Sequence, residues 1–84
     1  MTNKEFIELS KREVKEFIEY EYGAKNNIEI FVVWNCKTLQ NCKAILSTSI
    51  GGLFETTYNG DKNEIYFDAY KKVGNKCIKL RESQ

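Results

Sequence analysis

Three cysteines and no histidine limit the chemistry available to this chain. Histidine is the commonest general base and metal ligand, so a nucleophilic Cys36 has no imidazole to activate it. Cys36, Cys42 and Cys77 lack the paired spacing of a zinc site, and no glycine-rich phosphate loop is present. Glu64 and Asp68 lie too far apart along a predicted strand for the joint acid–base catalysis of hydrolases. The sequence therefore predicts a protein that is not an enzyme and that needs neither a metal nor a cofactor.

Two interpretations fit Cys36 and Cys42, which flank a predicted hairpin turn. They pack in the core or against the hairpin, or they form a reversible cross-strand disulfide. An odd number of cysteines without an apolar N-terminal signal segment favours free thiols in a reducing compartment. No apolar run approaches the roughly 20 residues of a membrane helix. We therefore expect a cytosolic protein that makes no membrane contact.

The charges nearly cancel in sum but are uneven along the chain. The net charge of +1 gives no global attraction to nucleic acid or membranes. Residues 1–24 carry four basic and six acidic side chains, whereas residues 25–84 carry nine basic and six acidic ones. The segment from Lys71 to Arg81 has no acidic residue and five basic ones, namely Lys71, Lys72, Lys76, Lys79 and Arg81. This cluster is either a solvated rim or a contact for phosphate or nucleic acid.

An amphipathic helix is predicted over residues 3–22. Thr2 and Glu5 have the spacing of a capping box. Apolar residues recur at helical intervals, and charged residues pair at i, i+4 on the opposite side. Gly23 is expected to end the helix in the left-handed conformation. The apolar stripe is expected to pack in the core, with a partner-binding helix as the alternative.

Alternating residues predict two strands, over residues 28–37 and 41–50, joined by a short loop centred on residues 38–40. Pairing Cys36 with Cys42 puts Trp34 opposite Ala44 and Val32 opposite Leu46. This register keeps one apolar face continuous, and such continuity is what fixes a register. Trp34 is therefore expected in the core.

Two further turns extend the antiparallel sheet. A three-residue loop over 51–53 is expected to pair Phe54 with Ile50. Asn59–Gly60 is the dipeptide of a type I′ hairpin turn, which would pair Phe54 with Ile65. The fourth strand then carries one apolar face, made of Ile65, Phe67 and Ala69.

These elements predict one α+β domain over residues 1–84. An N-terminal amphipathic helix packs on a four- or five-stranded antiparallel β-meander, and a fifth strand over residues 76–81 is left open. The predicted core consists of Phe6, Val14, Phe17, Ile18, Ile30, Val32, Trp34, Leu46, Phe54, Ile65 and Phe67.

One helix covers only one face of a sheet, so the other face stays open. Its predicted residues are apolar or aromatic, namely Phe31, Val33, Ile45, Leu53, Tyr66 and Tyr70. The predicted rim around them is polar, namely Glu29, Asn35, Lys43, Glu55 and Asp68. An apolar patch with a polar rim is typical of a protein-binding surface. Two alternatives stay open: a loop or the C-terminal segment folds over this face, or the register is shifted by one residue.

Three strings of the chain carry a resemblance: residues 32–41 (VVWNCKTLQN), residues 57–62 (TYNGDK), and Tyr66 with residues 68–72 (DAYKK). In these strings the chain resembles a family of small proteins of unknown function encoded by phages and prophages of Gram-positive bacteria. The resemblance spans residues 32–72. It implies a phage or prophage product in the host cytoplasm, and it carries no established catalytic residues. By analogy, such proteins bind a host or defence protein, or a small signalling molecule.

The expected function is that of a small, non-catalytic binding module. It would use the open face of the sheet either for self-association or to engage a host protein, because rim charges of mixed sign suit a protein partner. The alternative is a nucleic-acid or signalling-nucleotide binder. In that case the basic segment would meet phosphates, while Tyr66 and Tyr70 would stack on bases.

Overall fold

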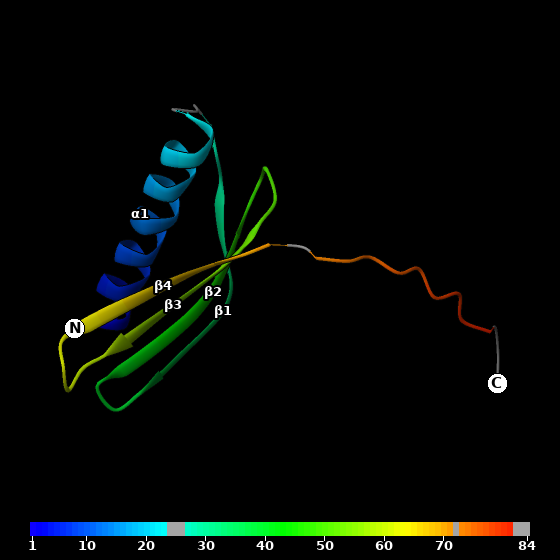
Figure 1. Ribbon diagram of the computed structural model, residues 1–84. Coiled ribbons are helices and arrows are strands. Elements are labelled where there is room, and N and C mark those ends of the chain that lie inside the picture. The colour runs from blue at the N-terminus through cyan, green and yellow to red at the C-terminus, as the bar shows by residue number, and fades with distance from the viewer. Residues whose placement is uncertain (24–26, 72, 82–84) are drawn as a thin grey trace.

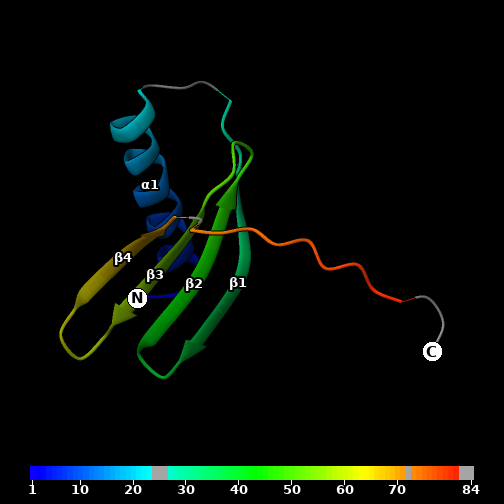
Figure 2. The same ribbon diagram turned by 45° about the vertical axis from the view of Figure 1, so that its right-hand side comes forward.

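The N-terminal amphipathic stretch forms one helix, and the alternating stretches after it form an antiparallel sheet. The computed structural model describes residues 1–23, 27–71 and 73–81. Its elements are α1 (Asn3–Tyr22), β1 (Ile30–Thr38), β2 (Asn41–Thr48), β3 (Leu53–Asn59) and β4 (Glu64–Tyr70). The strands are neighbours in the order β1-β2-β3-β4, and α1 lies on one side of them (Figures 1 and 2). The predicted α+β class is confirmed.

The ends of α1 follow from its capping residues. The backbone N–H of Glu5 donates to Thr2 Oγ1 at 3.1 Å, and the N–H of Thr2 donates to Glu5 Oε1 at 2.8 Å. These hydrogen bonds hold the pKa of Glu5 below its ordinary value. At the other end Gly23 has φ 82° and ψ 168°. The positive φ agrees with the prediction, but the ψ lies outside the left-handed helical region, so that part of the prediction is wrong.

The core forms where one stripe of α1 meets the sheet. The four buried residues of this stripe are Phe6, Ser10, Val14 and Ile18, and the helix contacts β1, β2 and β3. Ser10 Oγ and Thr56 Oγ1 lie 2.7 Å apart, fully buried, so a hydrogen bond joins the helix to the middle of β3. The rings of Phe17, Phe54 and Phe67 pack with centroids 5.6 to 5.9 Å apart. The buried positions predicted for Leu46 and Phe54 are also confirmed.

The structure buries three apolar residues that the predicted core omitted, namely Cys42, Ala44 and Tyr58, and three polar ones, namely Ser10, Thr48 and Thr56. Four predicted core residues are only half-buried and pack around the cluster, namely Phe17, Ile30, Ile65 and Phe67.

A β-bulge divides β1 into two parts. Val32 pairs with Leu46 in the predicted register, but the next pair is Trp34 with Ile45. Val33 is the extra residue between these pairs. From Trp34 onward the pairing is therefore shifted by one residue from the prediction.

The tight turn between β1 and β2 explains the shift. Thr38 pairs with Asn41, so the loop contains only Leu39 and Gln40. Leu39 has φ 54°, and Lys37 Nζ donates to its carbonyl oxygen at 2.6 Å. Two-residue loops are the commonest hairpin connections. The bulge allows this loop to form while the start of β1 keeps the pairing that turns its apolar residues towards the helix.

The bulge overturns the predicted core position of Trp34. A one-residue slip moves a side chain to the other face of the sheet, so Trp34 lies on the open face and is 47% exposed. Val32, on the edge strand, is 37% exposed and is also outside the core. Asn35 turns to the core face opposite Ala44, where its Oδ1 is buried without a hydrogen bond from any described residue. Its predicted place in the rim of the open face is therefore wrong.

The later strands keep their predicted faces but change partners. Phe54 pairs with Leu46 rather than with Ile50, and with Ala69 rather than with Ile65. Both pairings are shifted by an even number of residues, so the same side chains still face the helix. The connection between β2 and β3 is longer than predicted: Ser47 pairs with Leu53, so residues 48–52 lie between them, and both glycines there have positive φ.

The Asn59–Gly60 dipeptide does not form the predicted type I′ turn. Asn59 pairs with Glu64, which leaves a four-residue loop over 60–63. Asn59 Oδ1 accepts from the backbone N–H of Asp61 at 3.0 Å, as in an Asx turn. Within this loop the positive φ occurs at Asn63 and not at the glycine.

The fifth strand that the sequence left open is not formed in this structure. Residues 73–81 contain neither helix nor strand, and they run away from the sheet (Figures 1 and 2).

The exposure of Trp34 changes the stability expected on its removal. Leu46 is fully buried, so Leu46→Ala should cost about 2–5 kcal/mol of unfolding free energy. Trp34→Ala should cost well below the about 3–5 kcal/mol that is typical of a fully buried aromatic residue. Urea denaturation followed by circular dichroism measures both. Equal losses in the two variants would contradict the bulged register.

Candidate functional site

The open face of the sheet gathers apolar and aromatic side chains from all four strands. The register places six of them there: Phe31, Trp34, Ile45, Leu53, Tyr66 and Tyr70. These six residues are referred to as the open-face patch. All except the half-buried Ile45 are exposed, and the described residues place nothing over them. Exposed apolar area of this kind marks interaction sites.

The pairing aligns the patch in rows across the strands. Phe31, Ser47, Leu53 and Tyr70 form one row, and Trp34 and Ile45 begin the next. A hollow of about 280 Å³ adjoins Trp34, with Cys36 and Thr57 also in its lining. The indole ring therefore stands beside a concave part of the face, where a partner side chain can insert.

Five of the six residues predicted for a protein-binding face lie in the open-face patch. The sixth, Val33, is the extra residue of the bulge and is exposed on the edge strand. Trp34 is the residue that sequence reasoning missed. A two-residue turn between Thr38 and Asn41 was the available signal, because it places Trp34 opposite Ile45.

Carboxylates hold the tyrosine hydroxyls of this face. Tyr66 Oη donates to Glu64 Oε2 at 2.9 Å, and Tyr70 Oη donates to Glu55 Oε1 at 3.0 Å. Each hydrogen bond to a carboxylate stabilises the neutral phenol, so the pKa of Tyr66 and that of Tyr70 are raised above the ordinary value. Both rings are thereby kept neutral and oriented.

The charge of the open face is negative on the side of β3 and β4. Lys43 Nζ lies 3.6 Å from Glu55 Oε2, so its charge is largely matched. Glu64 and Asp68 share this face and form no ion pair with any described residue. Once the ion pair of Lys43 and Glu55 is counted as neutral, the charges that remain are acidic, and not of mixed sign as predicted.

The two hairpin cysteines lie on opposite faces of the sheet. Cys36 pairs with Lys43 on the open face and is exposed, whereas Cys42 pairs with Lys37 and is buried in the core. Both are free thiols. The core role is confirmed for Cys42, and the cross-strand disulfide is wrong because the one-residue shift separates the two side chains.

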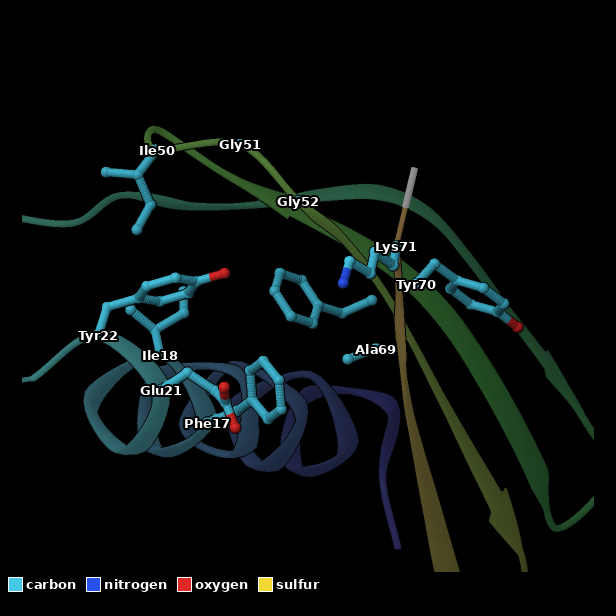
Figure 3. A pocket seen from close by; sticks show the side chains of 11 residues that line it. Phe17, Ile18, Glu21, Tyr22, Ile50, Gly51, Gly52, Ala69, Tyr70 and Lys71 are labelled. Atoms are coloured by element: carbon cyan, nitrogen blue, oxygen red, sulfur yellow. The ribbon is translucent and has the colours of Figure 1, made fainter. Parts of the chain in front are cut away.

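A larger pocket of about 610 Å³ lies on the other side of the sheet. It is bounded by the end of α1, the turn between β2 and β3, and the end of β4. In Figure 3, Phe17 and Tyr22 rise from the helix and Lys71 turns into the hollow, whereas Tyr70 points away. The pocket marks the place where the helix stops covering the sheet.

The basic segment is spread out rather than gathered into a site. Lys71 lines the larger pocket, and Lys76, Lys79 and Arg81 are exposed along the extended C-terminal residues. Lys72 lies outside the described residues. The structure therefore does not bring this predicted phosphate contact together with Tyr66 and Tyr70 of the open face.

Residues 1–23, 27–71 and 73–81 contain no group of three or more potential metal ligands. Within the same ranges, no helix has both the length and the apolarity to cross a membrane.

The hydrogen bond to Glu55 should be measurable as a change in tyrosine titration. Glu55→Gln removes the carboxylate, so the pKa of Tyr70 should fall towards its ordinary value. The absorbance of phenolate against pH would show the difference between variant and wild type. The difference should disappear in a Tyr70→Phe background, and the control Glu8→Gln on α1 should leave the curve unchanged. A wild-type curve for Glu55→Gln would exclude this contact in solution.

The chain matches no curated protein and no solved structure. A model of a family of unknown function, DUF6275, matches residues 4–80, from the start of α1 into the extended C-terminal residues. Because this match covers most of the chain, the protein belongs to the DUF6275 family.

Proposed function

We propose that this protein is a small, non-catalytic module that binds another protein through the open-face patch. The observation that carries the proposal is the uncovered row of apolar and aromatic side chains beside Trp34. Six such residues supply much of the roughly 800 Å² per partner of a standard interface. Tryptophan and tyrosine are also the residues most often found in binding hot spots.

The bulge in β1 supports a functional role for Trp34. Without the extra residue Val33, the side chain would face the helix. The bulge instead directs a large indole to the surface and places Asn35 on the core face with an unpaired Oδ1. Such an unpaired buried group costs about 1–3 kcal/mol. Bulges commonly re-aim side chains near functional sites.

The charges indicate the chemistry of the partner. Glu64 and Asp68 flank the aromatic residues, and Lys43 is already paired with Glu55. A partner with an apolar anchor flanked by lysine or arginine complements this surface. The same carboxylates would repel a polyanion.

The cellular setting of the proposal rests on the resemblance of residues 32–72 to phage and prophage proteins. On that basis the protein is a phage or prophage product that acts in the cytoplasm of its bacterial host. The partner would then be a host or defence protein.

Charge substitutions within the open-face patch should abolish binding without unfolding the domain. Phe31→Asp, Trp34→Asp and Tyr66→Asp should each reduce capture of a partner from bacterial lysate by about tenfold or more. The matched control is Leu39→Asp, an exposed apolar residue at the β1–β2 turn whose positive φ an aspartate tolerates. The measurement is a quantitative tagged pulldown, with circular dichroism to verify folding.

Capture of the same partner by all three patch variants would contradict the proposal. Light scattering of the purified protein separates this partner from self-association through the patch. If a patch variant changed the mass in solution, the open face would be an interface between copies.

The second candidate is nucleic-acid or nucleotide binding, because exposed aromatic side chains on a sheet can stack on bases. Fluorescence anisotropy with labelled oligonucleotides and nucleotides at rising salt tests it. We expect no salt-sensitive binding, since the carboxylates lie on the stacking face. Salt-sensitive binding that Lys76→Gln, Lys79→Gln or Arg81→Gln weakened would favour this function instead.

A further inference from the structure

The C-terminal residues 73–81 include the alternating pattern of a strand, but in this structure they do not pair with the sheet. They make no backbone hydrogen bond with any other described residue, and Val73, Ile78 and Leu80 are 99%, 68% and 88% exposed. Ile78 and Leu80 would share one side of an extended chain, and Lys79 and Arg81 the other. The family match reaches residue 80, so this segment is part of the family's pattern.

The edge of β4 is the part of the sheet best suited to receive a strand. β4 pairs with β3 without interruption from residue 64 to 70, and its other edge is free of described residues. The opposite edge, β1, carries the bulge, which discourages strand addition. On the helix side of β4, Ala69 is exposed and lines the pocket of about 610 Å³ (Figure 3), and Phe67 is only half-buried. An apolar strand here would complete the cover that α1 leaves incomplete.

One antiparallel register suits both faces of the added strand over residues 78–81. It places Ile78 and Leu80 on the pocket side and Lys79 and Arg81 on the acidic open face, while Lys76 begins the strand on the pocket side, opposite the Lys71 that lines the pocket. Its opposed pairs are Ile78 with Ala69, Lys79 with Asp68, Leu80 with Phe67, and Arg81 with Tyr66. Opposite charges and cation–aromatic pairs across strands are favourable. A slip of one residue would bury Lys79 against Phe67, so the pattern specifies this register over its neighbours.

We propose that two copies of this chain exchange their C-terminal segments, each adding residues 76–81 to β4 of the other as a fifth strand. A second copy is the occupant because the segment leads away from its own β4 rather than folding back on it (Figures 1 and 2). The exchange is reciprocal, so it forms a closed dimer with two-fold symmetry. It uses the free edge and pocket side of β4 and leaves the open-face patch uncovered for the proposed partner, while Lys79 and Arg81 come to lie beside that face.

A register-specific cross-link tests the exchange directly. The register puts Tyr70 opposite Cys77 of the other copy, with β-carbons about 4.5–5.5 Å apart, near the reach of a disulfide. Tyr70→Cys in a Cys36→Ser background should therefore give, on mild oxidation, a linked dimer of twice 9.8 kDa on a non-reducing gel. Peptide mapping should identify the bond between positions 70 and 77.

Two controls use the same background. Cys36→Ser alone and Asp68→Cys with Cys36→Ser should give no such dimer, since Asp68 faces Lys79 in this register. A 70–77 bond within one chain would show that the segment folds back on its own β4 and would overturn the exchange. The absence of any 70–77 bond would also overturn it.

The mass in solution provides the second measurement. Sedimentation of the wild-type chain should show a dimer, and Ile78→Asp with Leu80→Asp should raise its dissociation constant about tenfold or more. Val73→Asp is the matched control and should leave it unchanged. Lys79→Glu should weaken the dimer, and Asp68→Lys added to it should restore the affinity. A monomeric wild type would overturn the proposal. A dimer whose dissociation constant is unchanged by these substitutions would overturn it as well.

Trp34→Asp separates the exchange from the proposed function. This variant should lose the open-face partner and keep the dimer, because Trp34 lies on the strand at the far edge from β4. Loss of the dimer in Trp34→Asp would mean that the open face itself joins the copies and would overturn the exchange.

Discussion

The bulge at Val33 is the constraint on which the rest of this structure depends. The start of β1 must present Ile30 to the helix, while the two-residue turn at its end requires a pairing shifted by one. A regular strand cannot satisfy both, because a shift of one residue inverts every side chain. The extra residue resolves the conflict locally. Its consequence is global, since it places the one tryptophan on the surface and an asparagine on the core face.

The single helix sets the remaining limits. Its buried stripe is short, and the hydrogen bond between Ser10 and Thr56 aligns it with the middle of β3. The helix contacts mainly β1, β2 and β3 and meets β4 through Phe17 and Phe67, so the free edge of β4 and the pocket next to Phe17 are incompletely covered. A domain of this size buries only about 60% of the surface that its unfolded chain exposes. Both candidate interfaces follow from this shortage of cover.

Periodicity was sufficient to predict the elements and their faces but not their partners. The helix bounds follow from Thr2, Glu5 and Gly23, and the apolar alternation places Leu46, Phe54 and Phe67 on the helix side. Even shifts of register leave such a pattern unchanged, so nothing in it distinguishes Leu46 from Ile50 as the partner of Phe54. The odd shift at Trp34 is of another kind, because it depends on the geometry of one turn. Five of the six predicted patch residues were recoverable because no odd shift of register affects them. Trp34 was not recoverable because an odd shift moves it to the other face.

The two interfaces are linked through charge. In the exchanged dimer, Lys79 and Arg81 would lie on the open face beside Asp68 and Tyr66, while Lys43 already pairs with Glu55. The acidic side of that face would then be largely neutralised, leaving Glu64, whose carboxylate accepts the hydroxyl of Tyr66. A monomer would offer an acidic, aromatic surface, and a dimer a nearly neutral one with the same apolar patch. Rim charges affect the rate of association more than the affinity. The dimer would therefore select its partner mainly by the shape and area around Trp34.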